Sequence, residues 1–320
     1  MKAMVLAGKG KLELMDFPAP ELNAEGVIVK IEAAAICNAT DTRVLDADDP
    51  TAVWPNQAWP FVMGHEICGE VIEVGDEVEG WSRGERIAGW CPPYGGFAEY
   101  CQMYPGYMAA VKVPDALPSD IGALFEPAIG TARYFAPAAV SERVKQAKTA
   151  YVAGLGPTGI LYVGECRLLG VDRIIATDTH PSRRQLAKDF GADETYSRDA
   201  DPLPELARNG TDVDVAIDTT GSEAVLKSFL EFLKPGAVVI PFGVGWDMLA
   251  AEKEMRKRGI ILSSASVDEG RAIAPTVVDW VTSGKLPLER IITRRIRLDD
   301  LPEAFESLRR RADIKIVVRM

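Results

Sequence analysis

The chain reads TAYVAGLGPTG from Thr149 to Gly159. Its first five residues predict a short buried strand, and the glycines after them fit G-x-G-x-x-G where a helix begins. Such glycines allow a tight turn and let the backbone approach a pyrophosphate at the positive end of the helix. The alternative is a plain turn between strand and helix. The pattern predicts a dinucleotide site whose residues are Gly154, Gly156, Pro157, Thr158 and Gly159.

The alternation of strand and helix continues after this stretch. The predicted strands are 173–178, 213–218 and 237–242, and the predicted helices are 159–169, 183–190 and 222–232. Strands and helices joined by short loops in this order are typical of a parallel sheet with helices on both faces. The fold class predicted for this part is α/β, a doubly wound parallel sheet.

Asp178 closes the second strand of this series, nineteen residues after Gly159. A carboxylate at that place accepts hydrogen bonds from both ribose hydroxyls and repels a 2′-phosphate. Asp178 therefore favours NAD over NADP, although a carboxylate that only caps the strand is the alternative.

The residues before 119 have a different character. Short strands are predicted at 27–35, 67–74, 85–88 and 97–102, with Gly- and Pro-containing turns between them. Several short strands with few helices indicate an antiparallel, barrel-like unit. Further helices are expected at 127–139, 272–283 and 301–310, and a last strand at 314–319.

Length, composition and charge exclude several classes of protein. The 320 residues, 47% of them hydrophobic and 26% charged, suit a globular protein with room for two domains. The net charge of −11 argues against a nucleic-acid partner. No apolar run approaches the ~20 residues of a membrane span, and the first strand is too short for the core of a signal peptide. Five scattered cysteines indicate a reducing, cytoplasmic setting.

One of the two histidines lies in Gly64-His65-Glu66, just before a predicted strand. A neutral imidazole beside a carboxylate can begin a metal site, and Cys37 and Glu126 offer a thiolate and a further carboxylate. Each residue also has a structural alternative. His65 can be a core histidine, Glu66 its orienting partner, Cys37 a small buried residue, and Glu126 a carboxylate at a helix N-terminus.

Taken together, these motifs resemble the zinc-dependent medium-chain dehydrogenase/reductase family over essentially the whole chain. The resemblance is carried by Gly64-His65-Glu66, Gly95 to Tyr100, Glu126-Pro127, Gly154 to Gly159 and Ile314 to Val318. The Glu126-Pro127 pair is similar to the sorbitol (polyol) dehydrogenase branch. The family implies a GroES-like, partly open β-barrel catalytic domain at 1–128 and 268–320, with a Rossmann NAD-binding domain at 129–267 inserted in it.

The resemblance also implies a site. It puts one catalytic zinc on Cys37, His65 and Glu66, with Glu126 bound directly or through water, so that an activated alcohol can expel hydride to the nicotinamide. Thr40 resembles the hydroxyl that starts the proton relay, whereas His180 lies beyond the nucleotide-binding strand. Three residues are placed with less support, each a surface residue in the alternative: Thr131 at the nicotinamide, Arg183 over the adenosine ribose and Lys315 at the pyrophosphate.

The chain departs from the family pattern in two places. The family reads Cys-x-Ser/Thr-Asp, but the stretch from Cys37 to Asp41 is one residue longer. If Thr40-Asp41 sets the register, Asn38 falls at the ligand position, whereas a one-residue bulge delivers Cys37. The four-cysteine lobe of many members is reduced to Trp90 to Gly95 with one cysteine, Cys91, so no structural zinc is expected.

We expect an NAD-linked oxidation of a secondary alcohol to a ketone, the alcohol being a polyol, sugar-derived or cyclic. The alternatives are a metal-free quinone or enoyl reductase, or a nucleotide-binding protein that has lost catalysis. Aromatic residues near the metal segments suggest an aromatic pocket, with core packing as the alternative: Trp54, Trp59, Phe61, Trp90 and Tyr94. By analogy with the family, a homodimer or homotetramer is expected.

Overall fold

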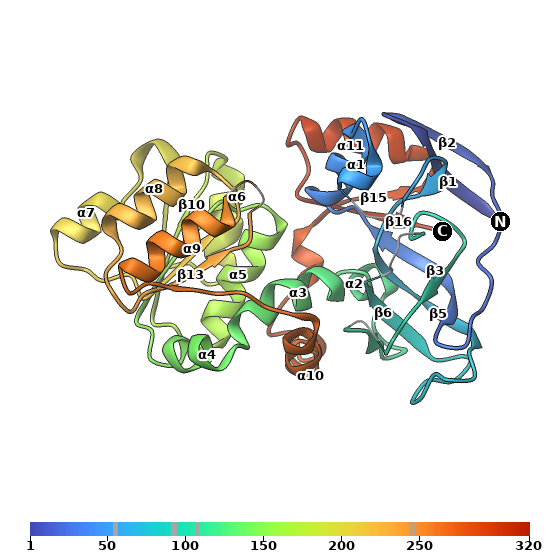
Figure 1. Cartoon of the computed structure of the whole chain (residues 1–320), viewed down its shortest axis with the longest axis horizontal. Coiled ribbons are helices and arrows are strands. Elements are labelled where there is room, and N and C mark those ends of the chain that lie inside the picture. The colour runs from blue at the N-terminus through green and yellow to red at the C-terminus, as the bar shows by residue number, and fades with distance from the viewer. Residues whose placement is uncertain (54–56, 91–94, 107–108, 244, 246) are drawn as a thin grey trace. The chain divides into compact units, whose positions relative to one another are not determined.

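The computed structural model describes residues 1–53, 57–90, 95–106, 109–243, 245 and 247–320. They form two compact units, labelled by element in Figure 1. The first unit comprises residues 1–129, 274–282 and 287–320, and the second comprises 130–273 and 283–286. Helices α3 (Phe125–Ala132) and α10 (Val267–Thr282) each contain residues of both units.

The second unit is built on a six-stranded sheet in which all strand pairs are parallel. Its order is β11 (Glu194–Tyr196), β10 (Arg173–Thr177), β9 (Thr149–Ala153), β12 (Val215–Asp218), β13 (Val238–Pro241) and β14 (Ile261–Leu262). The central strands β9, β12 and β13 are buried along their whole length, as strands with both faces covered must be. The predicted doubly wound parallel sheet is confirmed.

Helices cover both faces of this sheet. Figure 1 shows α5 (Pro157–Leu168) and α6 (Pro181–Asp189) on one side, and α8 (Glu223–Phe232) and α9 (Met248–Lys257) on the other. Two shorter helices, α4 (Ala138–Val144) and α7 (Leu203–Arg208), complete the unit. No helix among the described residues is long and apolar enough to cross a membrane.

The first unit is a predominantly antiparallel β structure. Its larger sheet has the order β15 (Ile292–Arg297), β16 (Lys315–Arg319), β3 (Val27–Ala35), β5 (Glu66–Val74), β6 (Arg86–Trp90) and β8 (Val111–Lys112), with β7 (Tyr100–Met103) also paired to β3. A smaller sheet joins β2 (Lys11–Asp16), β1 (Lys2–Gly8) and β4 (Phe61–Val62). Only the β15–β16 pair is parallel among the described strands of these two sheets.

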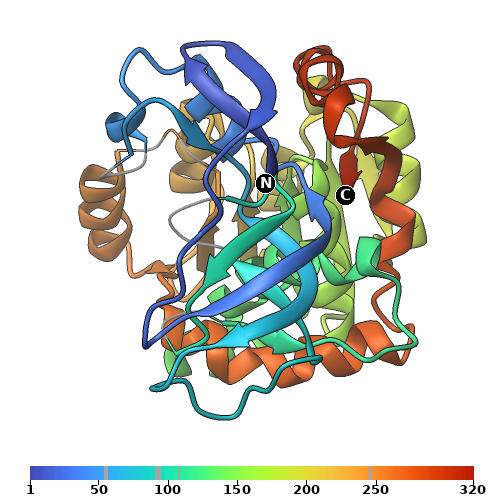
Figure 2. The same cartoon turned by 90° about the vertical axis from the view of Figure 1, so that its right-hand side faces the viewer.

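Segments from far apart in the chain meet on β3. Figure 2 faces this unit, in which β3 and β5 run side by side and antiparallel. The register places Ala35 opposite both Glu66 of β5 and Val317 of β16. Three strands therefore have ends at one place, where the chain leaves β3 and where β5 and β16 begin. Helices α1 (Thr40–Asp46), α2 (Ser119–Gly122) and α11 (Leu301–Arg309) complete the unit.

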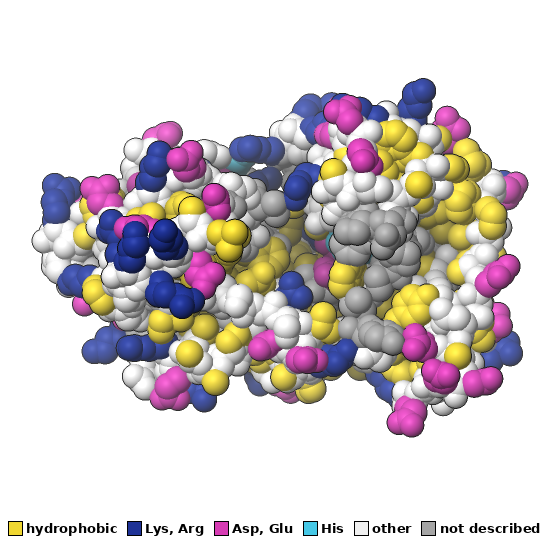
Figure 3. Space-filling view, viewed as in Figure 1, with side chains coloured by type: hydrophobic (Ala, Val, Ile, Leu, Met, Phe, Trp, Pro, Cys, Tyr) yellow, Lys and Arg dark blue, Asp and Glu magenta, His cyan; other side chains and the backbone are white. Residues whose placement is uncertain are grey.

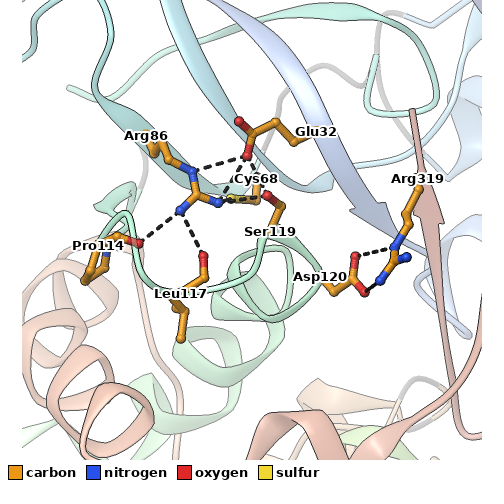
Figure 4. A network of polar contacts seen from close by, with 8 residues as sticks. All are labelled: Glu32, Cys68, Arg86, Pro114, Leu117, Ser119, Asp120 and Arg319. Atoms are coloured by element: carbon orange, nitrogen blue, oxygen red, sulfur yellow. Dashed lines mark hydrogen bonds and ion pairs between the residues drawn. The ribbon is translucent and has the colours of Figure 1, made fainter.

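Arg86 on β6 anchors the segment that leads into α2 (Figure 4). Its guanidinium donates to the carbonyls of Pro114 and Leu117 at 3.0 and 2.9 Å, and to the Ser119 hydroxyl at 2.8 Å. It also pairs with Glu32 on β3 at 3.1 Å. Only 13% of the Arg86 side chain is exposed. One planar side chain thus ties two strands to the loop before α2.

Replacing Arg86 with alanine is expected to lower the free energy of unfolding by about 2–3 kcal/mol, because two carbonyls and a carboxylate lose their donor. Chemical denaturation measures this change. The control is Arg294→Ala, whose side chain pairs with the exposed Glu303 and which is expected to cost less than about 1 kcal/mol. If both variants lose the same free energy of unfolding, the buried Arg86 network contributes no more to stability than an exposed ion pair.

Charged side chains of both signs are interspersed over both units on the face drawn in Figure 3. On α9, for example, Arg256 pairs with Glu252, and Arg258 pairs with Glu254. Such i,i+4 pairs on a helix surface contribute only a few tenths of a kcal/mol each. They belong to a solvated surface of mixed charge.

Candidate metal and cofactor sites

The strand ends on β3 and β5 bring together a sulfur, a nitrogen and an oxygen donor. Cys37 follows β3 by two residues, and His65 and Glu66 lie at the start of β5. One ligand atom from each residue lies within 4.8 Å of the other two. His65 and Glu66 are buried and Cys37 is half-buried. Three of the predicted metal ligands are therefore placed together.

Gly64 explains why His65 can take this position. Its φ is +87°, and a Cβ at this glycine would lie 2.8 Å from the Phe97 ring. The Gly64 carbonyl accepts the Gly96 N–H at 2.9 Å. A glycine is required where the chain bends this closely against Phe97 before entering β5.

Asp41 on α1 contacts two of the three donor residues, His65 and Cys37. Its Oδ1 lies 3.2 Å from Nδ1 of His65, and its Oδ2 accepts the Cys37 N–H at 2.9 Å. Burial lowers the pKa of His65, but Asp41 and Cys37 outweigh it, so that this pKa lies well above its usual value. The sequence reasoning did not assign Asp41 a role, although the Thr40-Asp41 pair was the available signal.

The extra residue between Cys37 and Asp41 is absorbed where α1 begins. The Asp41 N–H donates to the Cys37 carbonyl at 3.2 Å, and the Arg43 N–H donates to the Ala39 carbonyl. The Asn38 amide instead donates to the Ile314 carbonyl at 2.9 Å. The structure thus places Cys37 beside His65 and Glu66.

Glu66 forms a buried ion pair with Lys315, the first residue of β16. The Lys315 ammonium donates to Glu66 Oε1 at 2.7 Å and to the Ile36 carbonyl at 2.8 Å, and both charged side chains are 2% exposed. Burial raises the pKa of Glu66 to about 7, although Lys315 opposes this shift. The Lys315 ammonium is enclosed beside Glu66 here, and its contact with the pyrophosphate stays a prediction. A lysine between apolar residues of a strand was a hint of a buried partner.

Glu126 and Thr40 lie at the start of helices. Glu126 is half-buried in the first turn of α3. It is not one of the three close donors, but its charge helps to raise the pKa of both Glu66 and Lys315. Thr40 is the first residue of α1, half-buried, and directly precedes Asp41.

The donor set suits a zinc ion. Thiolate, imidazole and carboxylate are its usual ligands, and a histidine whose second nitrogen faces a carboxylate is typical of zinc sites. Cys37, His65 and Glu66 supply the first three, and Asp41 supplies the carboxylate behind His65. Metal binding at Nε2 would displace a proton from that nitrogen of His65, while Nδ1 keeps its proton next to Asp41.

Replacing Asp41 with asparagine is expected to weaken zinc binding about 10- to 100-fold, the usual cost of removing such a partner. Competition with a chromophoric chelator measures the affinity. Asp46→Asn on the same helix is the control, because Asp46 is exposed and pairs with Arg309. Unchanged zinc affinity in Asp41→Asn would show that Asp41 does not support the site.

The glycine loop lies between β9 and α5 as predicted. Gly154 has a φ of +89°, and a Cβ on Gly159 would lie 2.0 Å from the Gly154 carbonyl oxygen. A Cβ on Gly156 would meet nothing within 4 Å. Pro157 occupies the first turn of α5, and among the described residues no side chain caps this end. The first-turn N–H groups are therefore suited to an anion.

Asp178 lies directly at this loop. Its Oδ2 accepts the Leu155 N–H at 2.8 Å, and its Oδ1 accepts the His180 N–H at 2.7 Å. His180 is the N-cap residue of α6, away from the three metal-site donors in the chain order. Arg183 is half-buried on α6, while its neighbour Arg184 donates to the Asp178 carbonyl at 2.7 Å. The ribose contacts of Asp178 and Arg183 stay predictions.

Thr131 differs from its prediction. The side chain is fully buried, and its hydroxyl donates to Oε1 of Glu165 on α5 at 2.6 Å. The hydroxyl thus has a partner inside the second unit, and the place of Thr131 at the nicotinamide end stays a prediction. Glu165 had no signal in the sequence beyond its place in an apolar helix.

Of the aromatic residues predicted to wall a pocket, Trp54 and Tyr94 lie outside the described residues, as does Cys91 of the shortened lobe. Phe61 is buried in the core of the first unit, and Trp59 packs against that core. Trp90 is half-buried at the end of β6. Phe61 and Trp59 thus follow the alternative of core packing.

Comparison with known proteins finds relatives of both parts of the chain. The family model of the alcohol dehydrogenase GroES-like domain matches residues 23–116, and that of the zinc-binding dehydrogenase matches residues 157–282. The L-threonine 3-dehydrogenase of Shewanella loihica is 27% identical, over 95% of each chain. The structure of 2R,3R-butanediol dehydrogenase from Bacillus subtilis is 26% identical, with a TM-score of 0.79 over 100% of this chain and 99% of that one. Galactitol-1-phosphate dehydrogenase from Escherichia coli, 21% identical with a TM-score of 0.81 over 100% of both chains, shares the fold.

The chain belongs to the zinc-binding medium-chain dehydrogenases. It is an oxidoreductase of this class that acts on a CH–OH group with NAD. The GroES-like barrel and the Rossmann sheet are its two domains by fold.

Proposed function

We propose that this protein oxidises a secondary alcohol, a polyol, sugar-derived or cyclic alcohol, to the ketone and transfers the hydride to NAD. The observation that carries the proposal is the group of half-buried Cys37 with buried His65 and Glu66, whose donor atoms lie within 4.8 Å of one another. This group holds the one catalytic zinc, with Glu126 as a further ligand, directly or through a water. When bound, zinc supplies Lewis-acid activation of the alcohol oxygen.

The residues around the metal have separate tasks. Asp41 orients His65 through Nδ1, which leaves Nε2 for the metal. Lys315 balances the charge of Glu66, and this compensation permits a carboxylate in a buried site. The Thr40 hydroxyl takes the proton of the alcohol and passes it toward solvent through water or a ribose hydroxyl. Charge balance and proton transfer are thus the tasks of two different residues, Lys315 and Thr40.

The cofactor binds at the glycine loop. The N-terminal turn of α5 takes the pyrophosphate, and the open space beside Gly156 allows the close approach. Asp178, which already fixes the loop through the Leu155 N–H, accepts from the adenosine ribose and disfavours a 2′-phosphate.

The substrate class rests on the secondary hydroxyl. The relatives are named for L-threonine at position 3, 2R,3R-butanediol and galactitol 1-phosphate. Each of these molecules carries a secondary alcohol beside a second polar group. We extend that chemistry, and none of the individual substrates, to this chain.

A substrate screen with metal analysis tests the proposal. The purified protein is assayed for NAD reduction with polyols, cyclitols, simple secondary alcohols and primary alcohols, with and without a chelator. We expect about one zinc per chain, activity confined to secondary alcohols, loss with chelator, and weaker activity with NADP. Activity without zinc that resists chelation would contradict the metal assignment. Oxidation of primary alcohols alone would contradict the substrate class.

A further inference from the structure

Glu165 is a buried acid that the proposed reaction does not use. It lies in the middle of α5 with none of its surface exposed. Its Oε1 accepts the Thr131 hydroxyl at 2.6 Å, and its Oε2 has no hydrogen-bond partner among the described residues. No ion pair joins Glu165 to a lysine, arginine or histidine in the part of the chain described. A charged carboxylate here is left without a counter-charge.

Glu165 has an aromatic neighbour on the same face of α5. Tyr162, three residues earlier on the same face, is fully buried and makes edge contacts with Phe135 and Phe242 at 5.7 and 5.5 Å between ring centres. Its hydroxyl also has no hydrogen-bond partner among the described residues. The ionisable groups facing this cluster are Tyr162 and Cys166 on α5, and Arg133 and Tyr134 at η2 (Arg133–Phe135).

Burial sets the protonation state of this acid. It raises the pKa of Glu165 to about 8, and only the hydrogen bond from Thr131 opposes the shift. Arg133 acts on Tyr162 and is not among the groups that lower the pKa of Glu165. Glu165 therefore holds its proton at neutral pH, unlike an exposed glutamate.

We propose that Glu165 is a positioning residue of the cofactor-binding unit. As a neutral acid it accepts the hydrogen bond from Thr131 and so connects α5 to the end of α3. This connection fixes the position of α5, whose first turn binds the pyrophosphate. When the proton is lost in alkaline solution, a charge without a counter-ion enters the interior, α5 is held less firmly, and NAD binds more weakly. Glu165 touches neither NAD nor the reacting atoms in this proposal.

The direction of the pH dependence follows from linkage. In the unfolded chain the pKa of Glu165 is near its ordinary value of 4.5, and in the folded chain it is about 8. Because the folded state binds this proton more tightly, its contribution to stability is complete below 4.5 and is lost as pH rises through 8. Glutamine keeps the size and does not titrate.

Thermal unfolding without metal or substrate provides the first test. We expect the Tm of Glu165→Gln, relative to the natural protein, to rise steadily from pH 5 to pH 8 and to level off above it. Glu231→Gln, an exposed position on α8, is the control and should show no such trend. A Tm difference that is the same at every pH would overturn the proposal, because a purely steric role does not titrate.

NAD binding provides the second test, followed by quenching of tryptophan fluorescence. The dissociation constant of the natural protein is expected to rise at least threefold between pH 7 and pH 9, and that of Glu165→Gln to change less. Thr131→Val removes the one group that lowers the pKa of Glu165. The loss of NAD affinity in this variant should therefore begin at a higher pH than in the natural protein. If Glu165→Gln does not fold, an unshifted profile in Thr131→Val still contradicts the idea. Neither test uses an alcohol or zinc, so failure here leaves the proposed oxidation untouched.

Discussion

Replacing Cys37 with serine is expected to remove zinc from the proposed site and to lower kcat/KM by about 10³-fold or more. The thiolate is the only sulfur donor in the group with His65 and Glu66. A serine hydroxyl is a poor zinc ligand, because it stays protonated at neutral pH. Lewis-acid activation supplies several kcal/mol of transition-state stabilisation, and about 4 kcal/mol corresponds to this loss. Zinc content and steady-state NAD reduction measure the two effects.

Asn38→Ala is the matched control for this experiment, because Asn38 competes with Cys37 for the same place in the family pattern. Its amide nitrogen donates to the Ile314 carbonyl at 2.9 Å. The variant is expected to keep its zinc and most of its activity. If Asn38→Ala loses zinc while Cys37→Ser keeps it, the ligand assignment is wrong.

Replacing Gly159 with alanine abolishes stable folding of the cofactor-binding unit. The added Cβ would lie 2.0 Å from the Gly154 carbonyl oxygen, and a backbone atom cannot move away as a flexible side chain can. A destabilisation of ~3 kcal/mol or more is expected, large against the marginal stability of a domain. Thermal unfolding followed by circular dichroism measures it.

Gly156→Ala separates the two duties of the glycine loop. A Cβ there meets nothing within 4 Å, and the φ of −69° suits any residue. The variant should therefore fold like the natural protein but bind NAD about tenfold or more weakly, because the methyl group occupies the space through which the pyrophosphate approaches. Unchanged NAD affinity in a folded Gly156→Ala would mean that the pyrophosphate does not lie over this residue.

The spacing of apolar residues along the chain made most of the fold predictable. Strands β3 and β9 match their predicted bounds, because each is an apolar run with a glycine at one end, Gly26 before β3 and Gly154 after β9. Helix α1 was missed because it has only seven residues, and α9 because its buried face has few apolar residues, with Ala251 and Met255 in the core. Strand β2 was missed because it is largely exposed. These elements depend on tertiary contacts that local pattern does not carry.

The three candidate metal donors could be named from residue types, but their surroundings could not be predicted. Cys37, His65 and Glu66 could be named because few side chains bind zinc. The roles of Lys315 and Asp41 depend on which elements become neighbours in the fold. Lys315 and Glu66 are 249 positions apart, so no local pattern in the sequence indicates that they pair. The partner of Thr131 was unpredictable for the same reason, since Glu165 is reached only when α3 packs against α5.

The C-terminal strand has a consequence for how the protein is made. Glu66 emerges from the ribosome early, but its counter-charge on β16 follows only after the complete second unit has been synthesised. During that interval the Rossmann sheet has all its strands and can fold, while the carboxylate destined for the metal site remains without its lysine. Acquisition of zinc should accordingly be a late, post-translational step, and ribosome-bound chains stalled before residue 315 are expected to bind NAD before they retain metal.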